Sequence, residues 1–164
     1  MAIFSMKMDT SNVQVQALVR DLSGPLLAQV LFTSVNHVII PPARDMLKRN
    51  DSIDTGNLFR NLKAVIAISQ NGVAAVDVGS LGVDYGLDVE KGREPHSPDM
   101  RKLTRWAKRK LKAKNPILTA QRVSAHIQRT GVAARPYMRP TFERHKDRLV
   151  NDFVMRGRIA LRTT

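Results

Sequence analysis

The stretch that decides the fold is residues 54–92, DTGNLFRNLKAVIAISQNGVAAVDVGSLGVDYGLDVEKG. At its centre, two segments rich in Val and Ile flank Gln70-Asn71-Gly72. Side chains branched at Cβ suit a pleated sheet, and Asn-Gly between two such segments is the strongest short-range sign of a type I′ turn. The sequence therefore predicts an antiparallel β-hairpin over residues 62–78.

The hairpin needs covering elements, because an isolated two-stranded ribbon is only marginally stable in water. A weak helical pattern begins at Val13, after the N-cap candidates Thr10-Ser11-Asn12, and restarts at Pro25. Apolar residues then recur every three or four positions over 26–39, which predicts an amphipathic helix. The two prolines at 41–42 are expected to stop or kink it.

After the hairpin, residues 80–93 are predicted to form a glycine-punctuated loop, in which residues 85–89 are a candidate for one short ordered piece, and three helices follow. The first covers 99–114 with Ser97 as its N-cap, and Asn115-Pro116 ends it. The second begins at Thr119 and stops at Gly131, and the third covers 141–153. The basic C-terminal tail, 154–164, is expected to be either a late strand or a flexible end.

The expected fold class is α+β. A small antiparallel sheet is built on the central hairpin and is covered by a long N-terminal helix and by the C-terminal helices. With 164 residues, the chain is predicted to form a single domain, 1–164, with 98–131 as a basic helical insertion.

Charge is distributed unevenly along the chain, whose formal net charge is +13. Residues 1–97 contain nine Lys/Arg and ten Asp/Glu, whereas 98–164 contain eighteen and four. A one-sided basic cluster favours contact with nucleic acid or another polyanion, and the alternative is that these charges only solubilise helix surfaces. There is no cysteine, which excludes disulfides and thiolate metal sites. No targeting segment and no stretch of ~20 apolar residues is visible, so a soluble, cytoplasmic product is expected.

No pattern in the sequence recommends an enzyme, a metal site or a cofactor. Asp54-Thr55-Gly56 spells the aspartic-protease triplet, but its flanks are polar, so a turn or helix-cap role is favoured. The four histidines lack paired helical spacing. Three acidic residues, Asp84, Asp88 and Glu90, are too widely spaced for a cation loop and indicate a solvated loop or a subunit contact.

The helix around Trp106 carries most of the basic residues. Trp106 could stack on a base of a single strand, but its register with Leu103 and Leu111 favours the buried face. The surrounding charges show no base-reading pattern and support only sequence-independent attraction to phosphates. The candidates to face DNA are Arg101, Lys102, Arg105, Lys108, Arg109 and Lys112.

Four features follow one another in a recognisable order. An amphipathic N-terminal helix leads to Thr55-Gly56-Asn57-Leu58, and the hairpin ends in Val78-Gly79. A Val-x-Tyr-x-x-x-x-Glu-x-Gly segment occupies 83–92, and Ala-Arg-Pro-Tyr-Met-Arg-Pro occupies 134–140. Over residues 26–153 this order resembles the small head–tail joining, or tail-completion, proteins of the neck of long-tailed bacteriophages. The long basic stretch 98–131 and the double proline depart from that pattern.

The resemblance implies a structural virion protein without catalysis, assembled in the host cytoplasm and located at the head–tail junction. Its implied partners are identical subunits in a ring (a hexamer or dodecamer), a portal or head-closure protein, and a tail tube or tail terminator protein. Double-stranded DNA would pass non-specifically through the lumen, and no membrane is involved. A sequence-independent nucleic-acid-binding protein acting alone is the alternative. The candidates for assembly contacts are Thr55, Gly56, Leu58, Asp84, Tyr85, Asp88, Glu90, Arg135, Tyr137 and Arg139.

Overall fold

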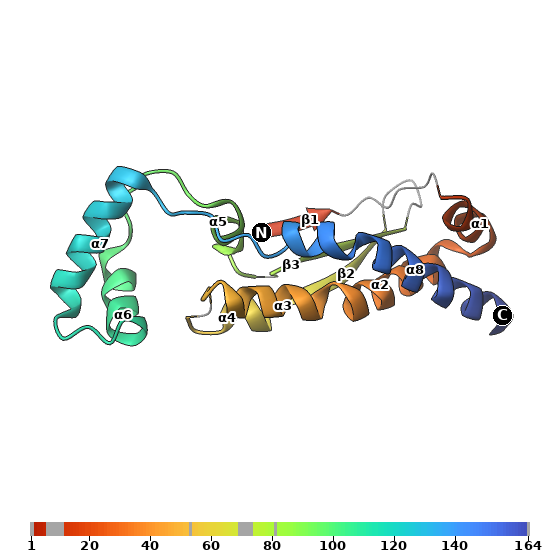
Figure 1. The fold of residues 1–164 in the computed structure, drawn as a ribbon, viewed down its shortest axis with the longest axis horizontal. Helices are drawn as coiled ribbons and strands as arrows, with labels where there is room; N and C mark the ends of the chain where they lie inside the picture. Colours follow the sequence, from red (N-terminus) through yellow and green to blue (C-terminus); the bar gives the residue numbers. More distant parts are fainter. Residues whose placement is uncertain (1, 6–11, 53, 69–73, 81, 164) are drawn as a thin grey trace.

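The computed structural model describes residues 2–5, 12–52, 54–68, 74–80 and 82–163 of an elongated molecule (Figure 1). A small antiparallel sheet is covered by helices, so the α+β prediction is confirmed. In chain order the elements are β1 (Ala2–Ser5), α1 (Val13–Asp21), α2 (Gly24–Val38), α3 (Ile40–Arg49), α4 (Asn57–Arg60), β2 (Leu62–Ile68), β3 (Ala74–Ser80), α5 (Gly86–Lys91), α6 (Met100–Lys110), α7 (Pro116–Thr130) and α8 (Arg139–Thr163).

The predicted hairpin is confirmed as β2 and β3, which pair antiparallel in a register that sets Leu62 opposite Ser80. Its turn, predicted at 70–72, lies outside the described residues. The sheet order is β1-β3-β2, so β3 is central and β2 forms an edge. The sequence did not predict β1, because four residues are too few to display the two-residue period of a strand.

Side chains alternate across β2 and β3 between a covered and an open face of the sheet. Leu62, Val76 and Val78 are buried among the helices, whereas Val65 points away and is 40% exposed. The covering helices α2, α3 and α8 complete the main core. Its fully buried members include Val38, Ile39, Leu47, Tyr137 and Met138.

The double proline separates α2 from α3 by one residue, Ile39. Pro41 and Pro42 lie in the first turn of α3, where backbone N–H groups have no partner within the helix, so proline costs little. The predicted break is therefore present, and a further helix of ten residues, α3, begins directly after it. It continues in the direction of α2 along one side of the sheet (Figure 1).

The segment Gly24–Arg49 is long and apolar enough, by length and composition, to cross a membrane. Its most apolar window of 18 residues has a mean hydropathy of 1.4, but polar residues interrupt it, so it contains no continuous apolar stretch of ~20 residues. The contacts of α2 with β2, β3 and α8 explain this composition, because a core helix passes the same test.

Helix α8 extends the predicted third helix in both directions, to Arg139–Thr163. The interpretation of 154–164 as a strand or flexible end is therefore wrong for the described residues. Phe153 and Val154 pack with Val15 and Leu18 of α1 in a second apolar cluster, which holds the C-terminal half of α8. Gly157 gives the side chain of Leu18 room: a Cβ there would lie 2.7 Å from Leu18 Cδ1.

The basic insertion, residues 98–131, forms the helix pair α6 and α7, which we call the arm; the rest of the chain is the body. The N-cap of α6 is Asp99, whose Oδ1 accepts from the N–H groups of Arg101 and Lys102, and not Ser97. The helix ends at Lys110, four residues earlier than predicted. Asn115-Pro116 starts α7 instead of only ending α6, because Asn115 caps it and Pro116 takes its first position. Its predicted stop at Gly131 is confirmed.

Candidate nucleic-acid interface

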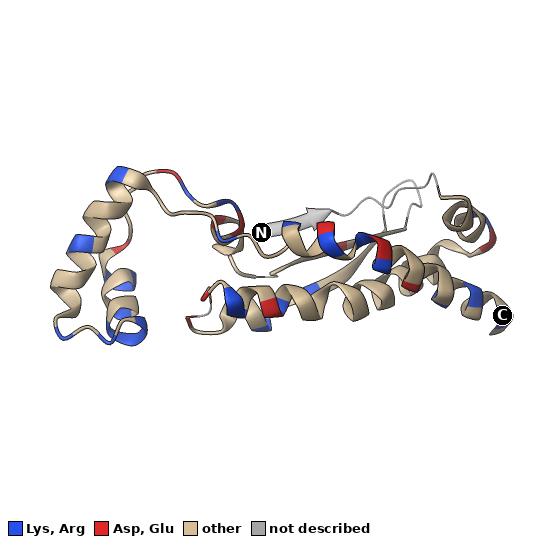
Figure 2. Cartoon of the chain, viewed as in Figure 1, with Lys and Arg blue, Asp and Glu red and all other residues tan. Residues whose placement is uncertain are grey.

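The arm carries a dense positive charge. Residues 98–131 contain ten Lys/Arg and a single acidic residue, Asp99, whereas the remaining 130 residues contain seventeen Lys/Arg and thirteen Asp/Glu. Figure 2 shows Lys and Arg along both helices of the arm and in their connection. Six of the ten were predicted to face DNA, and all six are exposed: Arg101, Lys102, Arg105, Lys108, Arg109 and Lys112.

Three arginines form a stripe along α6. Arg101, Arg105 and Arg109 are four residues apart, so they share one face of the helix at a rise of about 6 Å per step. Ala107 lies on the opposite side of α6 and is fully buried. The arginine stripe therefore faces outward, away from the packing surface between α6 and α7.

Trp106 lies off this stripe and is half-buried together with Leu103. Its interpretation as part of the packed face is thus closer to the structure than its use as an open stacking platform. Leu111 does not share that face. It follows the end of α6 and is 49% exposed, so its predicted burial is wrong.

Two acidic residues of the loop after α3 hold the basic end of α6. Arg109 donates two hydrogen bonds to the carboxylate of Asp54, from Nε to Oδ1 at 2.8 Å and from Nη2 to Oδ2. Asp51 accepts Lys110 Nζ at 2.5 Å, and this hydrogen bond lowers the pKa of the Asp51 carboxyl. In the other ion pair, the hydrogen bond to Asp54 raises the pKa of the Arg109 guanidinium. Both shifts favour the charged forms. Asp54 lies in the bend before α4, in agreement with the turn role predicted for it, and it also connects the body to the arm.

The same loop also contacts the segment that returns from the arm. Asn50 Nδ2 donates to the carbonyl of Pro136 at 2.9 Å, and Arg135 Nη1 donates to the carbonyls of Asn50 (3.3 Å) and Asp51 (3.4 Å). The loop therefore holds both α6 and the segment after α7.

At the root of the arm the chain leaves and re-enters the body at two neighbouring residues that form an isolated antiparallel bridge. Arg93 and Val132 exchange backbone hydrogen bonds of 2.9 and 2.7 Å. Gly92 (φ +75°) and Gly131 (φ +74°) flank this pair in the left-handed region. A Cβ on Gly92 would lie 2.6 Å from the carbonyl oxygen of Val132, and a Cβ on Gly131 would collide with that of Arg93. Glycine is therefore required at both positions.

A buried carboxylate joins two of the motifs behind the resemblance. Glu90 Oε2 accepts the backbone N–H groups of Tyr137 (2.7 Å) and Met138 (2.9 Å), and Oε1 accepts that of Arg139 (2.9 Å). These amides start α8, where the helix dipole favours a negative charge. Segments 47 to 49 residues apart in sequence are thereby fixed to each other.

Three predicted assembly residues are buried within the chain, so their assignment to a surface is corrected. Leu58 is 2% exposed, Glu90 5% and Tyr137 0%. The Tyr137 hydroxyl lies 3.2 Å from Ser80 Oγ, and burial raises the pKa of its phenol, with the negative charge of Glu90 acting in the same direction. These residues hold the body together.

The other predicted assembly residues lie at or near the surface. Thr55 and Gly56 form the turn that leads into α4. Tyr85 is 42% exposed, and Leu87 beside it is 40% exposed. Asp84 is also exposed. Asp88 accepts Arg93 at 3.3 Å, and Arg139 pairs with Glu143 at 2.9 Å.

Within the described part of the chain, no three His, Cys, Asp or Glu side chains converge on a possible metal position. The acidic residues Asp84, Asp88 and Glu90 are dispersed among solvent, Arg93 and the start of α8. The dense positive charge of the arm supports binding to a polyanion.

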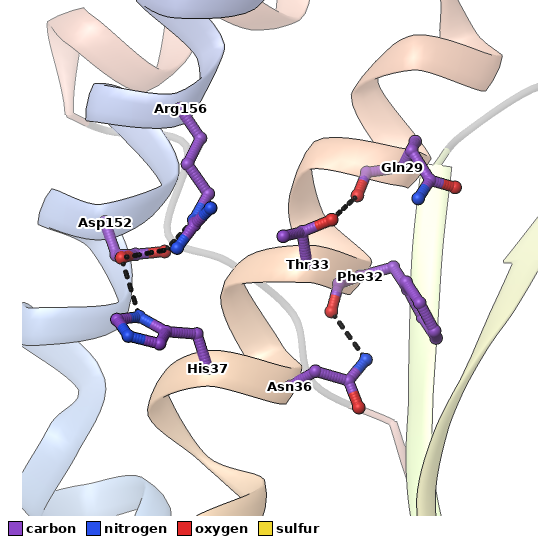
Figure 3. A network of polar contacts seen from close by, with 7 residues as sticks. All are labelled: Gln29, Phe32, Thr33, Asn36, His37, Asp152 and Arg156. Atoms are coloured by element: carbon purple, nitrogen blue, oxygen red, sulfur yellow. Dashed lines mark hydrogen bonds and ion pairs between the residues drawn. The ribbon is translucent and has the colours of Figure 1, made fainter.

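A polar network that the sequence did not predict joins α2 to α8 (Figure 3). Asp152, whose side chain is 9% exposed, accepts Arg156 Nε at 2.6 Å and lies 3.0 Å from His37 Nδ1. Burial opposes ionisation of Asp152, but hydrogen bonds, first of all from Arg156, leave its pKa below the usual value. The Asp152–Arg156 spacing of four residues is visible in the sequence, but the partner on α2 is not.

Comparison of the chain with protein-family models, with curated proteins and with solved structures finds no match.

Proposed function

We propose that the protein is a structural component of a bacteriophage neck, a ring-forming adaptor that joins the DNA-filled head to the tail tube. The observation that carries the proposal is the Glu90 contact. The two most distinctive motifs of the resemblance, at 83–92 and 134–140, meet through the carboxylate of Glu90 and the first amides of α8. A shared structural purpose for both motifs supports their interpretation as parts of one fold.

Two surfaces of the body are suited to contacts between identical subunits. Tyr85 and Leu87 present apolar area beside the start of α5, and aromatic residues are enriched at protein interfaces. Among the strands that the structure describes, β2 pairs with β3 alone, so its other side is an edge of the sheet, and it carries the exposed Val65. Closing these surfaces in a ring would repeat each weak contact at every subunit.

The arm gives such a ring a place for DNA. Ten basic residues in 34 positions attract phosphates without reading sequence, as a passage for any genomic DNA requires. In a ring the arms would repeat this attraction around the lumen.

The test removes the protein from the phage that encodes it. Without the protein, DNA-filled heads and separate tails should accumulate, and purified protein added to such an extract should join them. Tyr85→Ser/Leu87→Ser should fail to join them, whereas the control Met155→Ser/Ile159→Ser, which changes two apolar residues of α8 that are somewhat more exposed, should succeed. Infectious, tailed particles without the protein would refute the proposal.

A second candidate, a nucleic-acid-binding protein that acts alone, is favoured by the arm charge. The mass of the protein in solution, alone and with neighbouring virion proteins, separates the two. A stable monomer that binds duplex DNA tightly, with a steep dependence on salt, would favour this candidate over the ring.

A further inference from the structure

We infer that the arginine stripe of α6 binds the phosphate backbone of duplex DNA, and that Asp54 of the body competes with DNA for the last arginine of the stripe. The inference deepens the proposed function and rests on its contact with DNA. It makes the arm a latched element, held to the body when free and released when it binds DNA.

The stripe has the chemistry that phosphates require. Each guanidinium offers a planar set of donors that matches a phosphate or a carboxylate. Arg101 and Arg105 are exposed and make no ion pair with an acidic residue of the described chain, so they are available to a polyanion. Trp106 is half-buried off the stripe, which favours a contact with the backbone of a duplex over stacking on single-stranded bases.

Arg109 belongs to both arrangements. It is the third member of the stripe, and it is also the residue that Asp54 accepts at both guanidinium positions. If a DNA backbone follows the stripe, the phosphate next to the one bound by Arg105 meets the guanidinium of Arg109. Its donors, Nε and Nη2, are the ones that Asp54 accepts in the free protein. Asp51 and Lys110 strengthen the latch one residue further along α6.

The arm is attached in a way that permits release. In the structure α6 and α7 pack on each other and are joined to the body through two extended connections (Figure 1). Between α6 and the body, the contacts described above are two ion pairs at the surface, and such pairs contribute little free energy each. DNA can therefore displace them without unfolding the body.

The experiment measures binding of a fluorescent 20-base-pair duplex by the full chain at several salt concentrations. Asp51→Asn/Asp54→Asn removes the latch. The matched control, Asp21→Asn/Asp45→Asn, removes two body carboxylates that pair with neighbours on their own helices, Arg20 and Lys48. Because both variants have the same net charge, the latch variant should bind about threefold to tenfold more tightly than the control. Equal affinities would overturn the competition.

A second, independent experiment measures the position of the arm relative to the body. The chain has no cysteine, so spin labels at Gln29→Cys on α2 and Gln121→Cys on α7 report one distance between body and arm. Both positions are exposed. The distance distribution should be narrow in the parent and broad in the latch variant, and it should change when duplex DNA is added. A distribution unaffected by the latch variant and by DNA would overturn the release.

Substitution of the first two arginines of the stripe tests directly whether the stripe binds duplex DNA. Arg101→Gln/Arg105→Gln should weaken duplex binding and reduce the salt slope by about 0.9 for each phosphate that the variant no longer neutralises. The spin-label distance of the free protein should be unchanged by it. The stripe is not a duplex site if this variant binds DNA like the parent, or if the parent prefers single-stranded DNA. Neither result bears on ring assembly, which is tested separately by the mass of the protein in solution.

Discussion

The body and the arm are both built from amphipathic helices, but they bury very different side chains. In the body, two apolar clusters contain large residues such as Tyr137, Phe153 and Leu47, all fully buried. In the arm the buried residues are small: Ala107, Ala120, Ser124 and Gly131. Since apolar area removed from water is the main favourable term in folding, the body should be a stable frame and the arm a weakly held attachment.

The largest effect is expected when charge enters the core of the body. Val76→Asp places a carboxylate at a position 2% exposed, without a partner, and should cost more than about 4 kcal/mol, enough to unfold the body. Urea denaturation followed by circular dichroism measures this change in stability. Ala75→Asp, on the open face of the same strand, is the control and should remain folded.

A smaller loss of stability is expected from Glu90→Gln. An amide has one acceptor oxygen in place of two, while three backbone N–H groups need acceptors, so the start of α8 should lose about 2 to 3 kcal/mol. Glu94→Gln removes the same charge at an exposed site and should change the free energy of unfolding by less than about 0.5 kcal/mol. Equal losses in the two variants would show that Glu90 acts only through net charge.

Asp152 links stability of the body to pH. Because its folded pKa is lowered, the carboxylate stabilises the folded state above the unfolded value of about 3.9, and this contribution is lost as pH falls through the folded pKa. Asp152→Asn should cost about 1 to 3 kcal/mol at pH 7. Unfolding measured from pH 6 to pH 3 should show a weaker pH dependence in the variant than in the parent.

The smallest effect on the body is expected from a change inside the arm. Ala107→Asp disrupts packing between α6 and α7 and should unfold the arm while the body persists. The single tryptophan, Trp106, lies in the arm, and both tyrosines lie in the body. Fluorescence of Trp106 therefore reports the arm, and the near-ultraviolet circular dichroism that remains after the Trp106 signal is lost reports the body. Simultaneous loss of both signals would show that arm and body fold as one unit.

Local patterns predicted most of the body. Val and Ile on either side of Asn-Gly predicted the hairpin, and a three-to-four spacing predicted α2. The extension of α8 was missed because its apolar stripe is blurred: Phe153 and Val154 are buried, but Met155 and Ile159 are exposed. At Asn115 the pattern was ambiguous, since Asn-Pro both ends one helix and begins the next.

The sequence predicted which basic residues make up the candidate site, but it did not predict their contacts with the body. The sequence located the basic residues on a helix, and their exposure follows from its amphipathic pattern. The pairing of Asp54 with Arg109 joins residues 55 positions apart, and Glu90 meets the start of α8 over a similar separation. Contacts between distant polar residues leave no periodicity in the sequence, so only the folded chain reveals them.

The bridge between Arg93 and Val132 at the root of the arm has a consequence for how such a chain can evolve. Since the arm leaves and re-enters the body at hydrogen-bonded neighbours, a short turn could replace everything between them without displacing Glu90 or the start of α8. Evolution could therefore lengthen, exchange or delete the arm while the fold of the body is retained.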